Sequence, residues 1–378
     1  MAKKDINAAA IALHKKLGGK IRISPAMLVK NRAELSLIYT PGVAAVSSLV
    51  AKNKKLAREY TIKKRMIAVI SDGSAVLGLG NIGPYGALPV MEGKAALFKS
   101  FANVDAFPIT LEQGSVDEIV ETVCRIAPAF GGINLEDFKA PQCFDIEDRI
   151  KERLDIPVMH DDQHGTAIAV LAALINAAKV VDKDLRKLKI VISGAGAAGT
   201  AIAKLLLKAR VHDIIILDSK GTIDRNRQEK HKQDLAQKTN PREVRGGLQD
   251  ALSGADVLLG VSGPGLAQAA DIKLMAQKSI VLAMANPNPE IMPEEAKKGG
   301  AFVIGTGRSD YPNQINNSLV FPGVFKGALE NKVTKITDDM KLKAARNLAA
   351  LVKRPTAEKI IPGPFEKGIA EAVANAIK

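Results

Sequence analysis

Cysteine, tryptophan and long apolar runs are what this sequence of 378 residues has least of. The two cysteines, Cys124 and Cys143, are too few for a disulfide framework and lack the spacing of metal ligands, so a reducing compartment is expected. No uninterrupted apolar run approaches the roughly 20 residues that span a bilayer. Charged residues interrupt the apolar stretch at the N-terminus, which is therefore not expected to be a signal peptide. We predict a soluble, cytoplasmic protein without a membrane partner.

Aromatic residues are also scarce, at 4% of the chain, so the stacking platforms of proteins that bind single-stranded nucleic acid are not expected. The net charge is nevertheless +14, because 54 Lys and Arg residues oppose 40 Asp and Glu residues. The positive residues are spread from Lys3 to Lys378 without a dense stripe. We therefore expect no nucleic-acid partner, and a basic surface of this kind equally attracts small anionic ligands.

The length suits two domains, and the first half has the texture of an α/β fold. A strand-like run at 66–70 is followed by the glycine-rich turn SDGSAVLGLGNIGPYG and by a helix expected from about 92 to 101. Further strands are expected at 106–110 and 131–134. Each leads into polar residues at its C-terminal end, where open α/β sheets bind their ligands.

A second unit is expected to follow a helix at 165–180 and to begin with a strand at 189–193. We predict an N-terminal α/β substrate and metal domain over 1–160 and a Rossmann dinucleotide-binding domain over 161–378. Residues from about 317 to 378 are a candidate to pack back on the first domain. The charged stretch 224–245 is expected to be a solvated loop or helix.

The clearest motif is Gly194-x-Gly196-x-x-Gly199 between a strand and an apolar helix, with a second strand ending in Asp218. These glycines permit a tight turn, close approach of a pyrophosphate and close helix packing, in that order. A glycine turn at 262–265 suits the flank of the same cofactor, although an ordinary strand-to-helix loop looks identical. The residues expected to contact the dinucleotide are Gly194, Ala195, Gly196, Ala197, Ala198, Gly199, Asp218, Ser262 and Asn286.

The choice between NAD and NADP stays open. An acid at the position of Asp218 normally accepts hydrogen bonds from the ribose hydroxyls and repels a 2′-phosphate, which favours NAD. Lys220 and Arg225 follow closely enough in sequence to neutralise such a phosphate.

Two adjacent acidic pairs follow predicted strands: Glu136 and Asp137 in one, Asp161 and Asp162 in the other. Carboxylates that converge at a sheet edge repel one another unless a cation neutralises them. Oxygen ligands of this kind suit Mg²⁺ or Mn²⁺. The alternative is that either pair is the ordinary N-terminal cap of a helix.

Lys94 and Tyr39 are two further candidates. Lys94 is expected near the start of a helix and partly desolvated, and both conditions lower the pKa of a lysine towards that of a general base. Tyr39 precedes a Thr-Pro-Gly turn, where a tyrosine is usually a packed residue. Taken alone, Lys94 equally fits a solvated surface charge.

Together these segments resemble the malic enzyme family, in particular its short bacterial and archaeal branch, over nearly the whole chain. The resemblance rests on SLIYTPGVAAVS, ISDGSAVLGLGNIGPYGALPVMEGKAALFKSFANVDAFPI, GGINLEDFKAPQCF, HDDQHGTAIA, GAGAAG, MANPNPEI and GTGRSDYPNQINNSLVFPG. It implies oxidative decarboxylation of L-malate to pyruvate and CO₂ with NAD or NADP and a divalent metal, Mg²⁺ or Mn²⁺.

The resemblance also assigns roles to single residues. Lys94 corresponds to the general base and Tyr39 to the acid that protonates the enol product of decarboxylation. Glu136, Asp137 and Asp162 match the metal ligands, and Asp161 matches a neighbouring acid that hydrogen-bonds the catalytic lysine.

Amides and one hydroxyl complete the implied substrate site. Asn286 and Asn317 match amides that contact the nicotinamide side and the substrate carboxylate. The large eukaryotic branch holds that carboxylate with an arginine where this chain has Ala75, so Ser74 or Asn317 is expected to hold it instead.

Short members of the family are typically dimers in which the N-terminal segment reaches the neighbouring active site. We therefore expect a homodimer in which Tyr39 acts across the subunit boundary. Two alternatives remain: an oxaloacetate decarboxylase without useful dehydrogenase activity, against which the glycine motif argues, and a basic nucleic-acid-binding module with a vestigial Rossmann domain.

Overall fold

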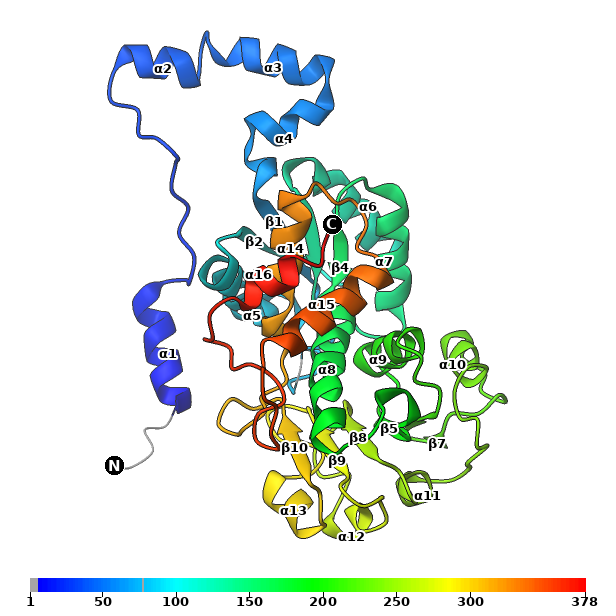
Figure 1. The fold of residues 1–378 in the computed structure, drawn as a ribbon. Coiled ribbons are helices and arrows are strands. Elements are labelled where there is room, and N and C mark those ends of the chain that lie inside the picture. Colours follow the sequence, from blue (N-terminus) through cyan, green and yellow to red (C-terminus); the bar gives the residue numbers. More distant parts are fainter. Residues whose placement is uncertain (1–5, 77) are drawn as a thin grey trace.

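The computed structural model describes residues 6–76 and 78–378, which form an N-terminal arm and a body built on two parallel sheets (Figure 1). The strand order in the first sheet is β2-β1-β3-β4, and all its pairs are parallel. The strands are β1 (Met66–Ser71), β2 (Asp105–Thr110), β3 (Gly132–Leu135) and β4 (Val158–His160). The strands predicted in this half are confirmed.

The second sheet has the order β10-β9-β8-β5-β6-β7, parallel except for the short edge strand β7. Its strands are β5 (Ile190–Ser193), β6 (Ile214–Asp218), β7 (Gly221–Thr222), β8 (Val257–Gly260), β9 (Ile280–Ala283) and β10 (Val303–Thr306). The chain runs outward from β5 in one direction through β6 and in the other through β8. Such a reversal of strand order opens a crevice at the carboxyl ends of the strands, where α/β sheets bind dinucleotides. The predicted α/β class is confirmed.

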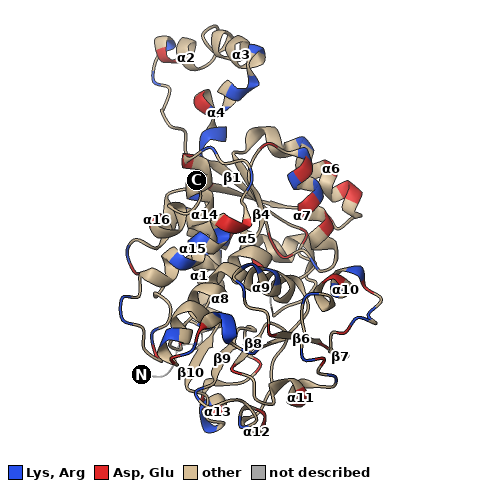
Figure 2. Cartoon of the chain, turned by 45° about the vertical axis from the view of Figure 1, so that its right-hand side comes forward, with Lys and Arg blue, Asp and Glu red and all other residues tan. Residues whose placement is uncertain are grey.

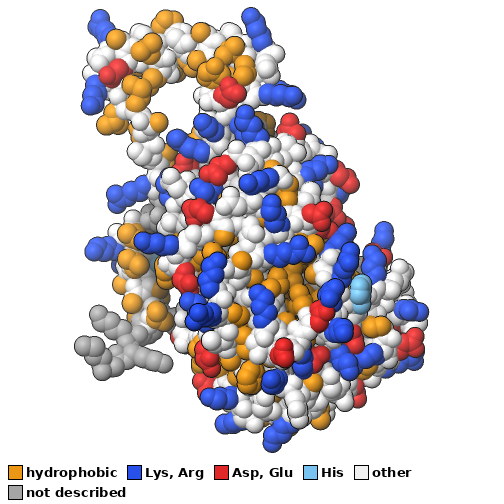
Figure 3. Space-filling view, viewed as in Figure 1, with side chains coloured by type: hydrophobic (Ala, Val, Ile, Leu, Met, Phe, Trp, Pro, Cys, Tyr) orange, Lys and Arg blue, Asp and Glu red, His pale blue; other side chains and the backbone are white. Residues whose placement is uncertain are grey.

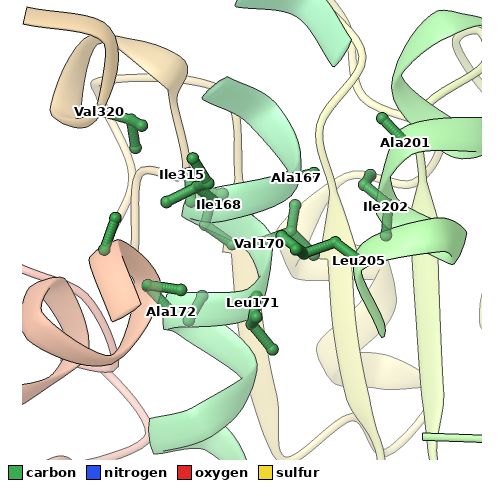
Figure 4. Close-up of a cluster of buried hydrophobic side chains, with 14 of the residues drawn as sticks. Ala167, Ile168, Val170, Leu171, Ala172, Ala201, Ile202, Leu205, Ile315 and Val320 are labelled. Atoms are coloured by element: carbon green, nitrogen blue, oxygen red, sulfur yellow. The ribbon is translucent and has the colours of Figure 1, made fainter. Parts of the chain in front are cut away.

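Helix α8 (Asp161–Val180) connects the two sheets and is apolar on almost every side. An all-round apolar helix has to be buried, and α8 packs against α9 (Ala197–Lys208) through Val170 and Leu205 among others (Figure 4). One continuous core therefore reaches from β1 through α8 to β5. The helix begins at Asp161, four residues before the predicted start, because acidic residues are favourable in a first helical turn.

The chain after β10 returns to the first sheet. Helix α14 (Phe321–Glu330) packs on α5 (Gly83–Ala102), where the ring of Phe98 lies 4.7 Å from that of Phe321 and 5.6 Å from that of Phe325. The other helices of the body are α6 (Val116–Ile126), α7 (Gln142–Arg153), α10 (Lys230–Ala236), α11 (Leu248–Leu252), α12 (Ala269–Ile272), α13 (Pro293–Lys298), α15 (Asp338–Ala350) and α16 (Ile369–Ala374). The last helices thus cover the helix that carries Lys94.

The arm stands away from the body and consists of α1 (Ile6–Leu17), α2 (Arg32–Ile38), α3 (Val43–Lys52) and α4 (Ala57–Tyr60) (Figure 1). None of these four helices buries a residue. Hydrophobic side chains line the arm in the space-filling view (Figure 3). The helix predicted before Gly18 is confirmed as α1, although none of its residues is buried.

One segment of the arm is relevant to the membrane prediction, which stays a prediction. Residues Arg32–Lys52 are long and apolar enough, by length and composition alone, to cross a bilayer, and none of the tested window is buried. The prediction counted only uninterrupted apolar runs and so passed over this segment, which contains Glu34. In the structure the turn at Thr40-Pro41 divides it into α2 and α3.

Glu147 of α7 fixes the start of α8, and its loss is expected to destabilise the fold. Its buried carboxylate, 2% exposed, accepts hydrogen bonds from the His160 N–H (2.9 Å) and His164 Nε2 (2.9 Å), and Lys151 Nζ lies 2.6 Å away. Because Glu147→Ala leaves the His160 N–H and the His164 ring without their hydrogen-bond acceptor, we expect a loss of about 3 kcal/mol in the free energy of unfolding. Urea unfolding followed by circular dichroism measures it. Glu152→Ala, at an exposed position of the same helix, is the control, and equal losses would contradict the assignment.

Candidate functional site

Two acidic pairs meet at the carboxyl edge of the first sheet. Glu136 follows β3 and Asp161 follows β4, and these strands are parallel neighbours that pair Leu135 with His160. One carboxylate oxygen from each of Glu136, Asp137 and Asp162 lies within 4.8 Å of the others. The structure therefore brings together the three residues predicted as metal ligands. Asp161 and Asp162 lie within the first turn of α8, but the N-cap of this helix is His160 and no side-chain cap hydrogen bond forms there, so the alternative that this pair caps the helix is wrong.

Hydrogen bonds from the backbone and from one amide side chain hold the cluster in place. The Asp137 N–H donates to Asp162 Oδ2 (2.9 Å), and Asn134 Nδ2 donates to Glu136 Oε2 (3.1 Å). Asp137 adopts a φ of 57°, and its carbonyl accepts a hydrogen bond of 2.8 Å from the Ala75 N–H. The glycine-rich turn after β1 is thereby attached to the acidic cluster.

The charges of the cluster favour a bound cation. Burial raises the pKa of Glu136 well above its ordinary value, and the Asp162 carboxylate raises it further, while Lys94 lowers it. A divalent cation would remove both the repulsion and the desolvation cost, since it supplies positive charge directly to the oxygens. The donor set is made of carboxylates only, which suits Mg²⁺ or Mn²⁺. The three residues thus fit the expected metal.

Lys94 lies beside this cluster, on α5. Its Nζ is 2.6 Å from Asp161 Oδ2 and 2.8 Å from Glu136 Oε1, and it sits 4.5 Å from the centroid of the Phe321 ring. The predicted contact with Asp161 is therefore present. The lysine thus contacts two carboxylates and an aromatic ring, and its side chain is only 12% exposed.

Two predictions about Lys94 are wrong. Helix α5 begins at Gly83 rather than near Glu92, because Pro84 is tolerated in a first turn and the helix buries Ala87, Met91 and other residues at helical spacing. Lys94 is thus in mid-helix, away from the N-terminal dipole. Burial does lower its pKa, but Asp161, Glu136 and Asp162 outweigh burial, so the pKa is raised in the chain without a metal.

Tyr39 is not brought to this cluster by its own chain. It ends α2 on the arm, and its side chain is 65% exposed. Figure 1 shows α2 and α3 well separated from α5 in the body. Within the described residues, no contact joins the Tyr39 side chain to Lys94 or to the acidic residues.

Ser74 and Asn317, the polar residues predicted to hold the substrate carboxylate, lie in different places: Ser74 in the glycine-rich turn and Asn317 beside α8. Ser74 is buried, and its hydroxyl accepts a hydrogen bond of 3.0 Å from the Lys139 N–H, so it holds the glycine-rich turn in place. Asn317 begins the short helix η5 (Asn317–Leu319) beside Gly165 of α8. A Cβ at Gly165 would come within 3.1 Å of the Asn317 Cβ and overlap Asp161 Oδ1. Glycine at 165 is therefore required for this approach, a requirement that the sequence pattern did not reveal.

The loop after β9, in the second domain, contacts the glycine-rich turn of the first domain at Asn286. The Asn286 carbonyl lies so close to Gly78, in the glycine-rich turn, that a Cβ at Gly78 would be 2.4 Å from it. Asn286 Nδ2 donates weakly to the Met284 carbonyl (3.4 Å). The loop after β9 and the turn after β1 are thus in contact.

The dinucleotide motif has the expected geometry. Gly194 has a φ of 123°, and a Cβ there would meet the Val261 carbonyl at 2.5 Å. At Gly199 a Cβ would overlap the Gly194 carbonyl, whereas nothing lies within 4 Å at Gly196. As predicted, Gly194 makes the tight turn, Gly196 leaves room for a pyrophosphate, and Gly199 permits close packing of the helix. On the flank, Ser262 Oγ is 3.1 Å from Ser193 Oγ.

Asp218, at the end of β6, is paired with residues that the sequence did not single out. Arg227 and Lys232 contact its carboxylate, whereas no described contact joins the side chains of Lys220 or Arg225 to it. Both partners lie in the charged stretch 224–245, which was expected to be solvated, but their side chains are only 12% and 15% exposed. Only the fold of the loop after β7 reveals which of its many cations turn inwards.

Comparisons with known proteins agree with this arrangement. Residues 18–151 match the family model of the malic enzyme N-terminal domain, and residues 163–376 match that of the malic enzyme NAD binding domain. An NAD-dependent malic enzyme of Geobacillus stearothermophilus is 53% identical over 96% of this chain and 76% of that protein. A bifunctional malic/malolactic enzyme of Bacillus subtilis is 51% identical over 99% of this chain and 92% of that protein. The crystal structure of an NAD-dependent malic enzyme from Thermotoga maritima, 47% identical, superimposes with a TM-score of 0.95 over 98% of both chains.

Proposed function

This chain belongs to the malic enzyme family, and we propose from that premise that it converts L-malate to pyruvate and CO₂ with reduction of NAD or NADP. The single observation that carries the proposal is the position of Lys94, 2.6 Å from Asp161 and beside three carboxylates suited to a divalent metal. Such a site can remove a hydroxyl proton next to a carboxylate and then stabilise the charge that decarboxylation releases.

Different residues of the chain bind the metal and transfer the substrate proton. A divalent cation held by Glu136, Asp137 and Asp162 would supply Lewis acidity to the substrate oxygens and lower the negative charge around Lys94. NAD or NADP, held at the glycine turn that contains Gly194, would supply the hydride acceptor. Lys94, whose pKa the cation would lower, would take the proton of the C2 hydroxyl, and Asp161 would hold the lysine in place through its hydrogen bond of 2.6 Å to Nζ.

We assign the final proton transfer to Tyr39, which protonates C3 of the enol of pyruvate, and the positioning of the substrate carboxylate to Asn317. The proximity of Asn317 to Asp161 across Gly165 supports the latter role. Ser74 serves the site by holding the glycine-rich turn on Asp137 and Lys139. Gly194, Gly196 and Gly199, with Ser262 and Asn286 on the flanks, hold the dinucleotide.

Reduction of NAD and of NADP by L-malate, assayed with Mn²⁺ and then with EDTA, tests the function. We expect reduction that requires both malate and the metal. Reduction that persists in EDTA would contradict the metal site, and absence of reduction with either cofactor would contradict the proposal.

A second candidate is decarboxylation of malate to lactate, with the cofactor reduced and reoxidised within one cycle. It is favoured by the name of the Bacillus subtilis relative, a bifunctional malic/malolactic enzyme. Lactate formed without net reduction of added NAD would support it, and pyruvate as the sole product would exclude it.

We further propose a cytoplasmic homodimer in which Tyr39 completes the site of the partner. The exposed apolar residues of the arm support a protein partner, because contiguous exposed apolar surface marks an interaction site. Leu35 is 46% exposed, Leu37 74%, Val46 37% and Leu49 41%. A second copy would bury these side chains and would bring the exposed Tyr39 to the site of its partner.

A mixed dimer tests this arrangement. Tyr39→Phe and Lys94→Ala homodimers are each expected to be inactive, whereas random mixing after co-expression is expected to restore about a quarter of the native activity. The reason is that half of the dimers are mixed, and each of these has one site with both residues intact. No recovery in mixed dimers that retain the native melting temperature would show that Tyr39 does not act across the boundary.

A further inference from the structure

Glu290 is a buried acidic residue in the segment that follows β9, and it is only 1% exposed. Among residues 6–76 and 78–378, no lysine or arginine forms an ion pair with it. A buried carboxylate without a cation is costly unless hydrogen-bond donors hold it. Two backbone donors do so here: the Ser262 N–H donates to Oε1 (2.7 Å) and the Ala285 N–H donates to Oε2 (3.2 Å). Hydrogen bonds to a charged acceptor are among the stronger ones in proteins.

The two donors belong to different loops. Ser262 follows β8 and Ala285 follows β9, and these strands are parallel neighbours in the second sheet (Figure 2). The main chain adds a further link, because the Glu290 carbonyl accepts a hydrogen bond of 3.1 Å from the Ala267 N–H. At Gly260, the last residue of β8, a Cβ would lie 2.4 Å from the Glu290 carboxyl carbon, so glycine is required for this approach. The carboxylate therefore links the loop after β8 to the loop after β9.

These two loops flank one half of the dinucleotide crevice. The strand order β9-β8-β5-β6 places them on one side of the Gly194 turn, which follows β5, and places Asp218, at the end of β6, on the other side. An acid in the position of Asp218 faces the adenosine ribose, and the pyrophosphate lies at the glycine turn. The loops after β8 and β9 therefore face the other half of the cofactor, which carries the nicotinamide.

Resting on the proposed function, we propose that Glu290 is a positioning residue that fixes these two loops relative to each other before the dinucleotide binds. A loop that is already ordered loses less conformational freedom on binding, so the nicotinamide half is bound more tightly. Burial raises the pKa of Glu290, whereas the backbone N–H donors lower it. The ionised form is the one whose two oxygens both accept hydrogen bonds without a proton between them, one from each loop.

Glu290→Gln tests the link, because it keeps the size of the side chain but turns an NH₂ group towards one of the two N–H donors. Binding of NADH, followed by its fluorescence, is compared with binding of ADP, which lacks the nicotinamide riboside. Neither measurement needs malate or metal. We expect NADH affinity to fall at least about tenfold and ADP affinity to stay within about twofold. Glu294→Gln, at an exposed position a few residues further on, is the matched control and is expected to change neither affinity.

The outcomes separate this role from a purely structural one and from the function itself. Unchanged NADH affinity in a folded Glu290→Gln protein would overturn the proposal and leave the proposed function standing. An equal loss of NADH and ADP affinity would also overturn it, because Glu290 would then support the whole domain rather than the nicotinamide side. Failure of the native protein to bind NADH would overturn the proposed function.

Hydrogen exchange in the native protein carries the test if Glu290→Gln does not fold. The Ser262 and Ala285 amides are expected to exchange at least about a hundredfold more slowly than unprotected amides before any cofactor is added, because both are already donated to Glu290. Unprotected exchange that slows only when NADH is added would show that the cofactor, and not Glu290, orders the loops, and this would overturn the proposal.

Discussion

Replacing Lys94 with alanine is expected to lower kcat for malate oxidation by about a thousandfold, within the range that a positioned general base contributes. The loss follows because no other base lies within hydrogen-bonding distance of both Asp161 and Glu136 among the described residues. Rates with saturating malate, cofactor and Mn²⁺ measure it. NADH binding is expected to stay within about twofold, because Lys94 lies outside the dinucleotide turn.

Two further proteins separate chemistry from structure. Lys94→Arg keeps the positive charge between Asp161 and Glu136 but cannot serve as a base at neutral pH, so it is expected to fold and remain inactive. Lys99→Ala, on the same helix but in an exposed ion pair with Asp105, is expected to keep native activity. Partial rescue of Lys94→Ala by added ammonium would support the base assignment, and activity in Lys94→Arg close to the native level would refute it.

Asp162→Asn is expected to weaken Mn²⁺ binding by at least about a hundredfold, since even residues that only orient metal ligands contribute up to that factor. The amide keeps an oxygen for the Asp137 N–H but removes one of three negative charges. Isothermal titration with Mn²⁺ measures the affinity. Asp145→Asn, at an exposed position of α7, is the control.

The same substitution is expected to act in the opposite direction on the metal-free protein. Asp162 raises the pKa of the buried Glu136, so its charge destabilises the empty cluster. The melting temperature of metal-free Asp162→Asn should therefore equal or exceed that of the native protein, while the rise on adding Mn²⁺ should disappear. A lower melting temperature without metal together with native Mn²⁺ affinity would show that Asp162 has only a structural role.

Much of the fold follows from local patterns. The strand at 66–70 is bounded by a glycine-rich turn, and the Gly194 motif stands between a strand and an apolar helix, so periodicity and turn chemistry agree at both places. The proximity of the acids after β3 and β4 could be predicted from the sequence, because neighbouring parallel strands have their carboxyl ends at the same edge of a sheet.

Other features depend on packing that no local pattern contains. Helix α5 contains two prolines, so its first part was expected to be a loop. Its buried face against α14 is visible only in the folded structure. The pKa of Lys94 depends on the convergence of three carboxylates from two strand ends, and the sequence indicated only helix position and burial. Arg227 and Lys232 could not be distinguished from the other cations of 224–245 until the loop was folded onto Asp218.

L-malate labelled with ¹³C at C4 tests the central claim most directly, because it separates oxidation with decarboxylation from oxidation alone. Incubated with the protein, NAD and Mn²⁺, the label is predicted to leave as CO₂ and bicarbonate, with one unlabelled pyruvate formed for each NADH. Retention of the label in oxaloacetate at the end of the reaction, with NADH formed, would contradict the account.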